Sequence, residues 1–174
     1  MSDCHCILCE DHGELDDIDR QTMENVRTHG WGVINIPADD AGPGWSFSVG
    51  LWHSHRSPEL AMFGLDMDVT QPVINNLGRE IADGRAAADG QERHGLINDY
   101  PIHLKQIDRG WYQTFFGVAM AFYRRPPLPV IQLVWPDLDG RFPWDAETAE
   151  GYQAMQPQAW LARDAHPPGV WTES

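Results

Sequence analysis

All three cysteines of the chain lie close together near its N-terminus, at Cys4, Cys6 and Cys9. Thiolates are good zinc ligands, and a structural zinc site takes four ligands arranged as a tetrahedron. His12 completes a C-x-C-x2-C-x2-H spacing, so the sequence predicts a compact site with three cysteines and one histidine. His5 is a poorer ligand because it stands between two cysteines and would point away.

The fourth ligand has alternatives elsewhere in the chain. His53, His55 or His94 could supply it, and the metal would then fix the N-terminus to the body of the protein. An iron–sulfur cluster fits less well, because such clusters normally take four cysteines. Cysteines that merely pack, or stay free in a tail, are the remaining alternative. It is weakened by the lack of cysteine anywhere else in the sequence.

A second group of reactive side chains is the W-H-S-H stretch with its two histidines, followed by Glu59. If the preceding strand continues, His53 and His55 face the same side and could share a metal. Glu59 or His103 could then be a third ligand of a catalytic site, where the metal activates water and Glu59 serves as ligand or general base. Alternatively, H-S-H-R-S-P is a polar turn, since turns collect such residues.

Other catalytic signatures are weak or missing from the sequence. Ser46 and Ser48 have no G-x-S-x-G context, and there is no glycine-rich phosphate loop. The eight tryptophans could line a cleft for a flat ligand, but core packing explains most of them more simply.

Composition and charge limit the classes of partner. The formal charge of −14, from 26 acidic and 12 basic side chains, argues against nucleic acid. Proline or charge interrupts every apolar stretch, and no basic region precedes an apolar block at the N-terminus. We therefore expect no membrane span, no secretory signal, a reducing cytoplasm, and a monomer or weak homo-oligomer.

The order of expected elements predicts an α+β fold. We expect a first helix with its N-cap at Asp16-Asp17 and its end at His29-Gly30, followed by strands at 31–36, 45–51 and 60–65. A helix at 66–84, a polar loop, a strand at 100–107, an apolar helix at 109–125 and a buried strand at 128–135 come next. This order suggests a single-layer mixed, mainly antiparallel sheet with helices packed chiefly on one face.

Three regions follow from these patterns. Residues 1–15 form an N-terminal metal clip, residues 16–145 a single α+β domain, and residues 146–174 a tail rich in proline and tryptophan that wraps around it.

Several stretches resemble the bacterial family catalogued as domain of unknown function 4262. They are GWGVINI, WSFSVGLWHSHRSPELAMFGLD, YPIHLKQID, WYQTFFG and FYRRPPLPVIQLVWPDLDGRFPWD, from about Gly30 to Asp145. The opening C-x-C-x2-C is also similar to that of many members, which implies a metal at the three cysteines. Members commonly have histidine directly before P-E-L, where this chain has Ser57. The family has no established activity, so the resemblance implies a fold boundary and not a reaction.

The leading interpretation is a zinc-stabilised binding or interaction module for a protein or small ligand. The P-E-L strand, the His53–His55 stretch and nearby tryptophans would form its recognition cleft. The G-L…P-E-L element loosely resembles suppressor-of-fused-like domains, which bind other proteins. A metal-dependent hydrolase using His53, His55, Glu59 and His103 is the alternative, and a thiol or redox protein is the second one. The sequence does not decide whether the protein is an enzyme.

Overall fold

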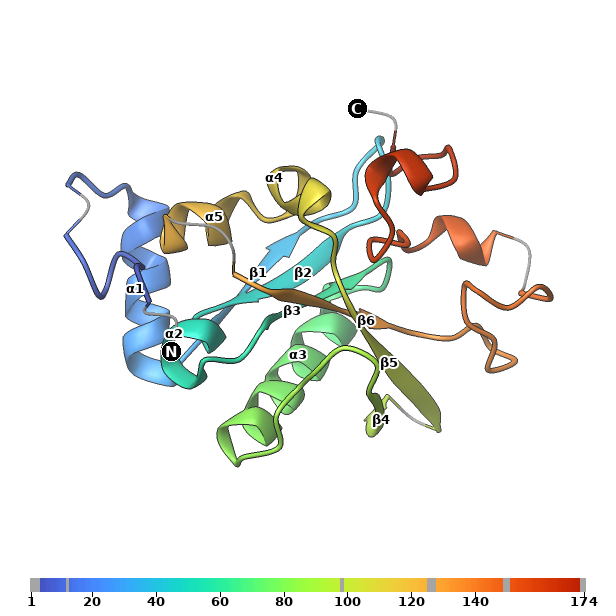
Figure 1. The fold of residues 1–174 in the computed structure, drawn as a ribbon, viewed down its shortest axis with the longest axis horizontal. Coiled ribbons are helices and arrows are strands. Elements are labelled where there is room, and N and C mark those ends of the chain that lie inside the picture. The colour runs from blue at the N-terminus through green and yellow to red at the C-terminus, as the bar shows by residue number, and fades with distance from the viewer. Residues whose placement is uncertain (1–3, 12, 98, 125–127, 149–150, 173–174) are drawn as a thin grey trace.

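The computed structural model describes residues 4–11, 13–97, 99–124, 128–148 and 151–172 (Figure 1). Six strands form one open sheet in the order β1-β2-β3-β6-β5-β4. They are β1 (Gly32–Ile36), β2 (Trp45–Val49), β3 (Glu59–Phe63), β4 (Glu92–Ile97), β5 (Tyr100–Gln106) and β6 (Val130–Val134). The pairing of β3 with β6 is parallel and the other four are antiparallel. The predicted α+β class with a mixed, mainly antiparallel sheet is confirmed.

The helices vary widely in length. They are α1 (Asp17–His29), α2 (Leu51–His55), α3 (Met67–Ala82), α4 (Tyr112–Phe115) and α5 (Gly117–Tyr123), with 3-10 turns η1 (Arg109–Trp111), η2 (Tyr152–Ala154) and η3 (Arg163–Ala165). The expected ends of α1 are confirmed. The Asp16 carboxylate accepts the Asp19 N–H in a capping box, and Gly30 ends the helix with φ 88°.

The core is divided between the two faces of the sheet, because β3 is apolar on both sides. Ala61 and Phe63 belong to one buried cluster, whereas Leu60 and Met62 belong to the other. Figure 1 shows α3 on one face and α4 and α5 on the opposite face. Helices were expected chiefly on one face. They cover both because a strand with two apolar sides needs cover on each.

Three local expectations were wrong. The expected polar loop contains β4, where buried Arg93 donates to the Glu80 carboxylate at 3.0 Å and to the Ala86 carbonyl at 2.6 Å. The expected single helix over 109–125 is divided, because Phe116 leaves helical geometry with φ −125° and ψ 38°. The stretch after β2 is neither strand nor turn but the short helix α2, which starts after Gly50 at φ 119°.

The C-terminal segment, residues 151–172, lies beside α4 (Figure 1). Trp171 is buried with Phe63 and Phe115, and its Nε1 donates to the Ala154 carbonyl at 3.0 Å. The Trp111 Nε1 donates to the Leu161 carbonyl at 2.8 Å. The division into a clip, a domain and a tail stays a prediction. Within the described ranges, no helix has both the length and the apolar character needed to cross a membrane.

Candidate metal centre

The first described residues form a tight turn that is fixed to α5. The N–H groups of Cys9 and Glu10 both donate to the Cys6 carbonyl at 3.0 Å, which closes the turn. Ile7 is buried, and its N–H donates to the carbonyl of Phe122 at 3.0 Å. These backbone bonds place the cysteines beside α2.

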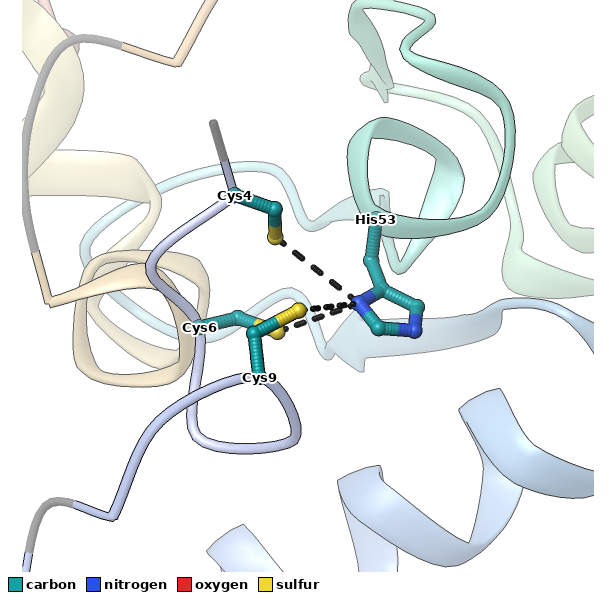
Figure 2. A group of neighbouring side chains, drawn as sticks. All are labelled: Cys4, Cys6, Cys9 and His53. Atoms are coloured by element: carbon teal, nitrogen blue, oxygen red, sulfur yellow. Dashed lines mark hydrogen bonds between the residues drawn. The ribbon is translucent and has the colours of Figure 1, made fainter. Parts of the chain in front are cut away.

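The three sulfurs meet one imidazole nitrogen. Figure 2 shows the side chains of Cys4, Cys6 and Cys9 directed at His53. The His53 Nδ1 lies 3.2 Å from the Cys6 Sγ, 3.4 Å from the Cys9 Sγ and 3.7 Å from the Cys4 Sγ. All four ligand atoms lie within 4.8 Å of one another.

These separations suit a tetrahedral ion. With Zn–S bonds of about 2.3 Å and Zn–N bonds of about 2.0 Å, the sulfur–nitrogen edges of a tetrahedron are about 3.5 Å and the sulfur–sulfur edges about 3.8 Å. The observed sulfur–nitrogen distances of 3.2–3.7 Å bracket that edge. Cys4, Cys6, Cys9 and His53 therefore form a group that could hold a metal ion.

Burial sets the protonation of these ligands. It raises the pKa of Cys6 to about 12, with a further rise from the hydrogen bond to Cys4, and it also raises the pKa of Cys9. Burial lowers the pKa of His53, and the positive charge of Arg56 acts in the same direction. His53 is thus neutral, the form that binds metals, while the thiols would have to release protons to a bound ion.

A buried carboxylate holds the start of α2. Glu59 is 1% exposed, and its Oε1 accepts the N–H groups of Gly50 at 2.9 Å and Trp52 at 3.0 Å. Its Oε2 accepts the hydroxyl of Ser48 at 2.5 Å. Burial raises the pKa of Glu59, although each of these hydrogen bonds acts to lower it. The first N–H groups of a helix have no partner within the helix, and the Glu59 carboxylate accepts them here. It thereby fixes the first residues of α2.

Tyr123 of α5 connects this carboxylate to His53. Its hydroxyl donates to the Glu59 Oε1 at 2.5 Å and accepts the N–H groups of Gly50 at 3.0 Å and His53 at 3.3 Å. Burial, followed by the nearby Glu59, raises the pKa of Tyr123 well above its usual range. The backbone of His53 is thereby fixed from the interior while its ring reaches the cysteines.

Of the candidate fourth ligands, the structure brings His53 to the cysteines. His12 lies outside the described residues. His5 is directed at Glu10, with its Nδ1 2.5 Å from the Oε1. His94, on β4, has its Nε2 3.4 Å from Glu92.

The structure does not bring the other catalytic candidates together. His55 shares α2 with His53, but residues two apart on a helix point in nearly opposite directions, and its ring lies 6.4 Å from that of Trp31. The strand on which the two histidines would share a face does not continue past Val49, and on the helix they face different sides. The Glu59 carboxylate accepts the Gly50 N–H at the start of α2 and does not point at the cysteines. His103, on β5, packs against Phe142, with 4.4 Å between the two ring centroids.

Sequence reasoning missed Tyr123 altogether. Its bond to Glu59 joins residues 64 positions apart, and no local pattern signals such a pairing.

Comparison with known proteins places most of the chain in a family. The sequence model described as "Domain of unknown function (DUF4262)" matches residues 25–149. The chain belongs to this family. The matched DUF4262 region contains His53, Glu59 and Tyr123, whereas the three cysteines precede it. No curated protein and no solved structure matches the chain. Family membership therefore carries no established activity.

Proposed function

We propose that this protein is a binding module stabilised by a structural zinc ion. Cys4, Cys6, Cys9 and His53 would hold the ion and so fasten the N-terminal segment to α2. The observation that carries the proposal is the convergence of three Sγ atoms on the His53 Nδ1 at 3.2–3.7 Å. Three thiolates and one imidazole are a donor set typical of structural zinc. A reducing cytoplasm, where the thiols stay unoxidised, would suit it.

A structural role is better supported than the hydrolase alternative. Four protein ligands fill a tetrahedron, whereas catalytic zinc keeps one position open for water. Glu59, the expected general base, is buried and accepts hydrogen bonds on both oxygens. A carboxylate engaged in this way has no free path to a water molecule on the metal.

The thiol or redox alternative is supported by one observation, the exposure of Cys9. Against it, the pKa values of Cys6 and Cys9 are raised and not lowered. Reactive cysteines have lowered pKa values, because the thiolate is the nucleophile. The metal role therefore accounts for more of the geometry.

The binding role is supported by large apolar side chains left in solvent. Leu138 is 88% exposed and Met155 is 39% exposed. Contiguous exposed apolar surface is typical of sites that bind a protein or ligand.

Elemental analysis of the purified protein tests the zinc proposal. We expect about one zinc per chain in the unaltered protein and in the matched control His55→Ala. The double variant Cys6→Ser/Cys9→Ser should hold none, and His53→Ala should lose zinc to a chelator that the parent resists. Full zinc retention in the double variant would contradict the proposal.

A further inference from the structure

An apolar groove lies at the opposite end of the sheet from the cysteines. Its volume is about 760 Å³, and its walls include Leu65, Ile97, Tyr100, Trp135, Tyr152 and Met155. In Figure 1 the turn that follows β6, drawn in orange, lies far from α2 and the N-terminus. Ligand pockets of this size and apolar lining are common in proteins.

The lip of the groove presents a leucine to solvent on a fixed turn. The Asp137 carboxylate accepts the N–H groups of Asp139 and Arg141, both at 2.9 Å. The Asp137 N–H donates to the Arg141 carbonyl at 2.8 Å, and the Tyr100 hydroxyl donates to the Leu138 carbonyl at 3.0 Å. The exposure of Leu138 is thus built into the turn.

The charge around the groove is negative. Its described lining holds Asp137 and Asp139 but neither lysine nor arginine, and the exposed Asp99 precedes Tyr100. The neighbouring Arg141 lies 4.0 Å from the Asp139 carboxylate and 3.7 Å from that of Glu147, and it donates to the Glu147 carbonyl at 2.7 Å. The whole chain has a formal charge of −14. A ligand that complements this rim carries positive charge.

We propose that this groove binds a peptide segment of another protein in which a large apolar side chain is flanked by lysine or arginine. The apolar side chain packs on the groove wall beside Ile97 and Met155, and Leu138 covers it from the lip. The basic side chains pair with Asp139 and Asp99. The proposal rests on the binding role proposed above and names its partner class, but it does not depend on the metal.

A random-peptide display library selected on the zinc-loaded full chain tests this assignment. Clones that also bind the variant Leu138→Ser are removed, and the remaining peptides are synthesised and titrated by fluorescence anisotropy. We expect enrichment of a large apolar residue next to lysine or arginine. Binding should weaken about 10-fold or more in Leu138→Ser and about 3-fold in Asp139→Asn. The matched control is Ile18→Ser, which alters an apolar residue 58% exposed on α1 and should leave binding unchanged.

Three results would overturn the assignment. They are a selection that yields no Leu138-dependent peptide, enrichment of acidic peptides, and equal weakening in the Ile18→Ser control. If dodecyltrimethylammonium binds in a Leu138-dependent way and no peptide does, the groove is a small-amphiphile site and the proposal fails. Zinc content is measured on the same samples. Peptide binding without zinc refutes the metal proposal alone, and zinc without peptide binding refutes the groove proposal alone.

Discussion

The two irregular ends of the chain reach the same buried cluster by different means. Cys4, Cys6 and Ile7 enter it from the N-terminal segment, residues 4–11, and Ala159 and Trp171 enter it from the C-terminal segment. The C-terminal segment brings the buried ring of Trp171 and the Leu161 carbonyl, which accepts the indole N–H of Trp111. The N-terminal segment is shorter and brings converging metal ligands.

This difference shows how length determines the means of attachment. A segment of eight residues buries too little apolar surface to offset the entropy lost when it is ordered. The proposed metal cross-link would supply the missing free energy. The longer C-terminal segment is held by aromatic burial and by hydrogen bonds to the body of the protein, such as that from the Trp111 Nε1 to the Leu161 carbonyl. Removal of the metal should therefore loosen the N-terminal segment and leave the C-terminal segment in place.

The largest expected effect is loss of the N-terminal attachment in Cys6→Ser/Cys9→Ser. Removing two thiolates should weaken zinc binding at least about 10,000-fold, or about 5.5 kcal/mol. Hydrogen exchange should then accelerate at the amides of Ile7 and Glu10, which are bonded to Phe122 and Cys6. Amides of β3 and β6 should stay protected. Unchanged protection at Ile7 would mean that packing alone holds this segment.

Trp171→Ala should destabilise the fold through the other end. Trp171 packs against the rings of Trp45, Phe63 and Phe115 with centroid distances of 6.5, 5.6 and 5.8 Å. Its removal should lower the free energy of unfolding, measured with urea, by about 3–5 kcal/mol. Zinc content should stay at that of the parent. Trp144→Ala, at a site 42% exposed, is the control and should cost much less. Zinc loss in Trp171→Ala would show that the two ends are coupled.

Glu59→Gln should change how stability depends on pH. Burial raises the pKa of Glu59 above 4.5, so the folded protein binds this proton more tightly than the unfolded chain does. Its contribution to stability is therefore complete below pH 4.5 and declines as the pH rises through the folded value. The decline is about 1.4 kcal/mol for each tenfold difference in proton affinity.

Urea unfolding of the parent and Glu59→Gln between pH 4.5 and 8 measures this decline. The free energy of unfolding of the parent, minus that of the variant, should fall as the pH rises. Glu14→Gln, the same change at an exposed site, is the control. A difference that rises with pH would mean that the hydrogen bonds to the carboxylate outweigh its burial.

His55→Ala is expected to have the smallest effect. The side chain lies on a different side of α2 from His53, so stability should change by less than about 0.5 kcal/mol. Zinc affinity, measured against a chromophoric chelator, should be unaltered. A loss of affinity comparable with that of His53→Ala would place His55 in the metal site.

Much of the fold could be predicted from short-range patterns. The Asp16 cap and the Gly30 stop of α1 are local, so the sequence shows them directly. β4 was missed because its buried Arg93 is bonded by Glu80 of α3 and by the Ala86 carbonyl, contacts that no local pattern reveals.

The candidate site was predicted in part for the same reason. The three cysteines are neighbours in sequence, so their convergence needed only a turn. The choice of His53 depended on α2 being a helix, and that depends on Glu59 and Tyr123 lying against its first turn. No periodicity near the histidine reveals contacts from such distant positions.

X-ray absorption at the zinc edge of the purified, unaltered protein tests the central claim most directly. The account predicts four-coordinate zinc with three sulfurs at about 2.3 Å and one nitrogen at about 2.0 Å. A coordination shell of nitrogen and oxygen alone, or a protein that takes up no zinc, would contradict it.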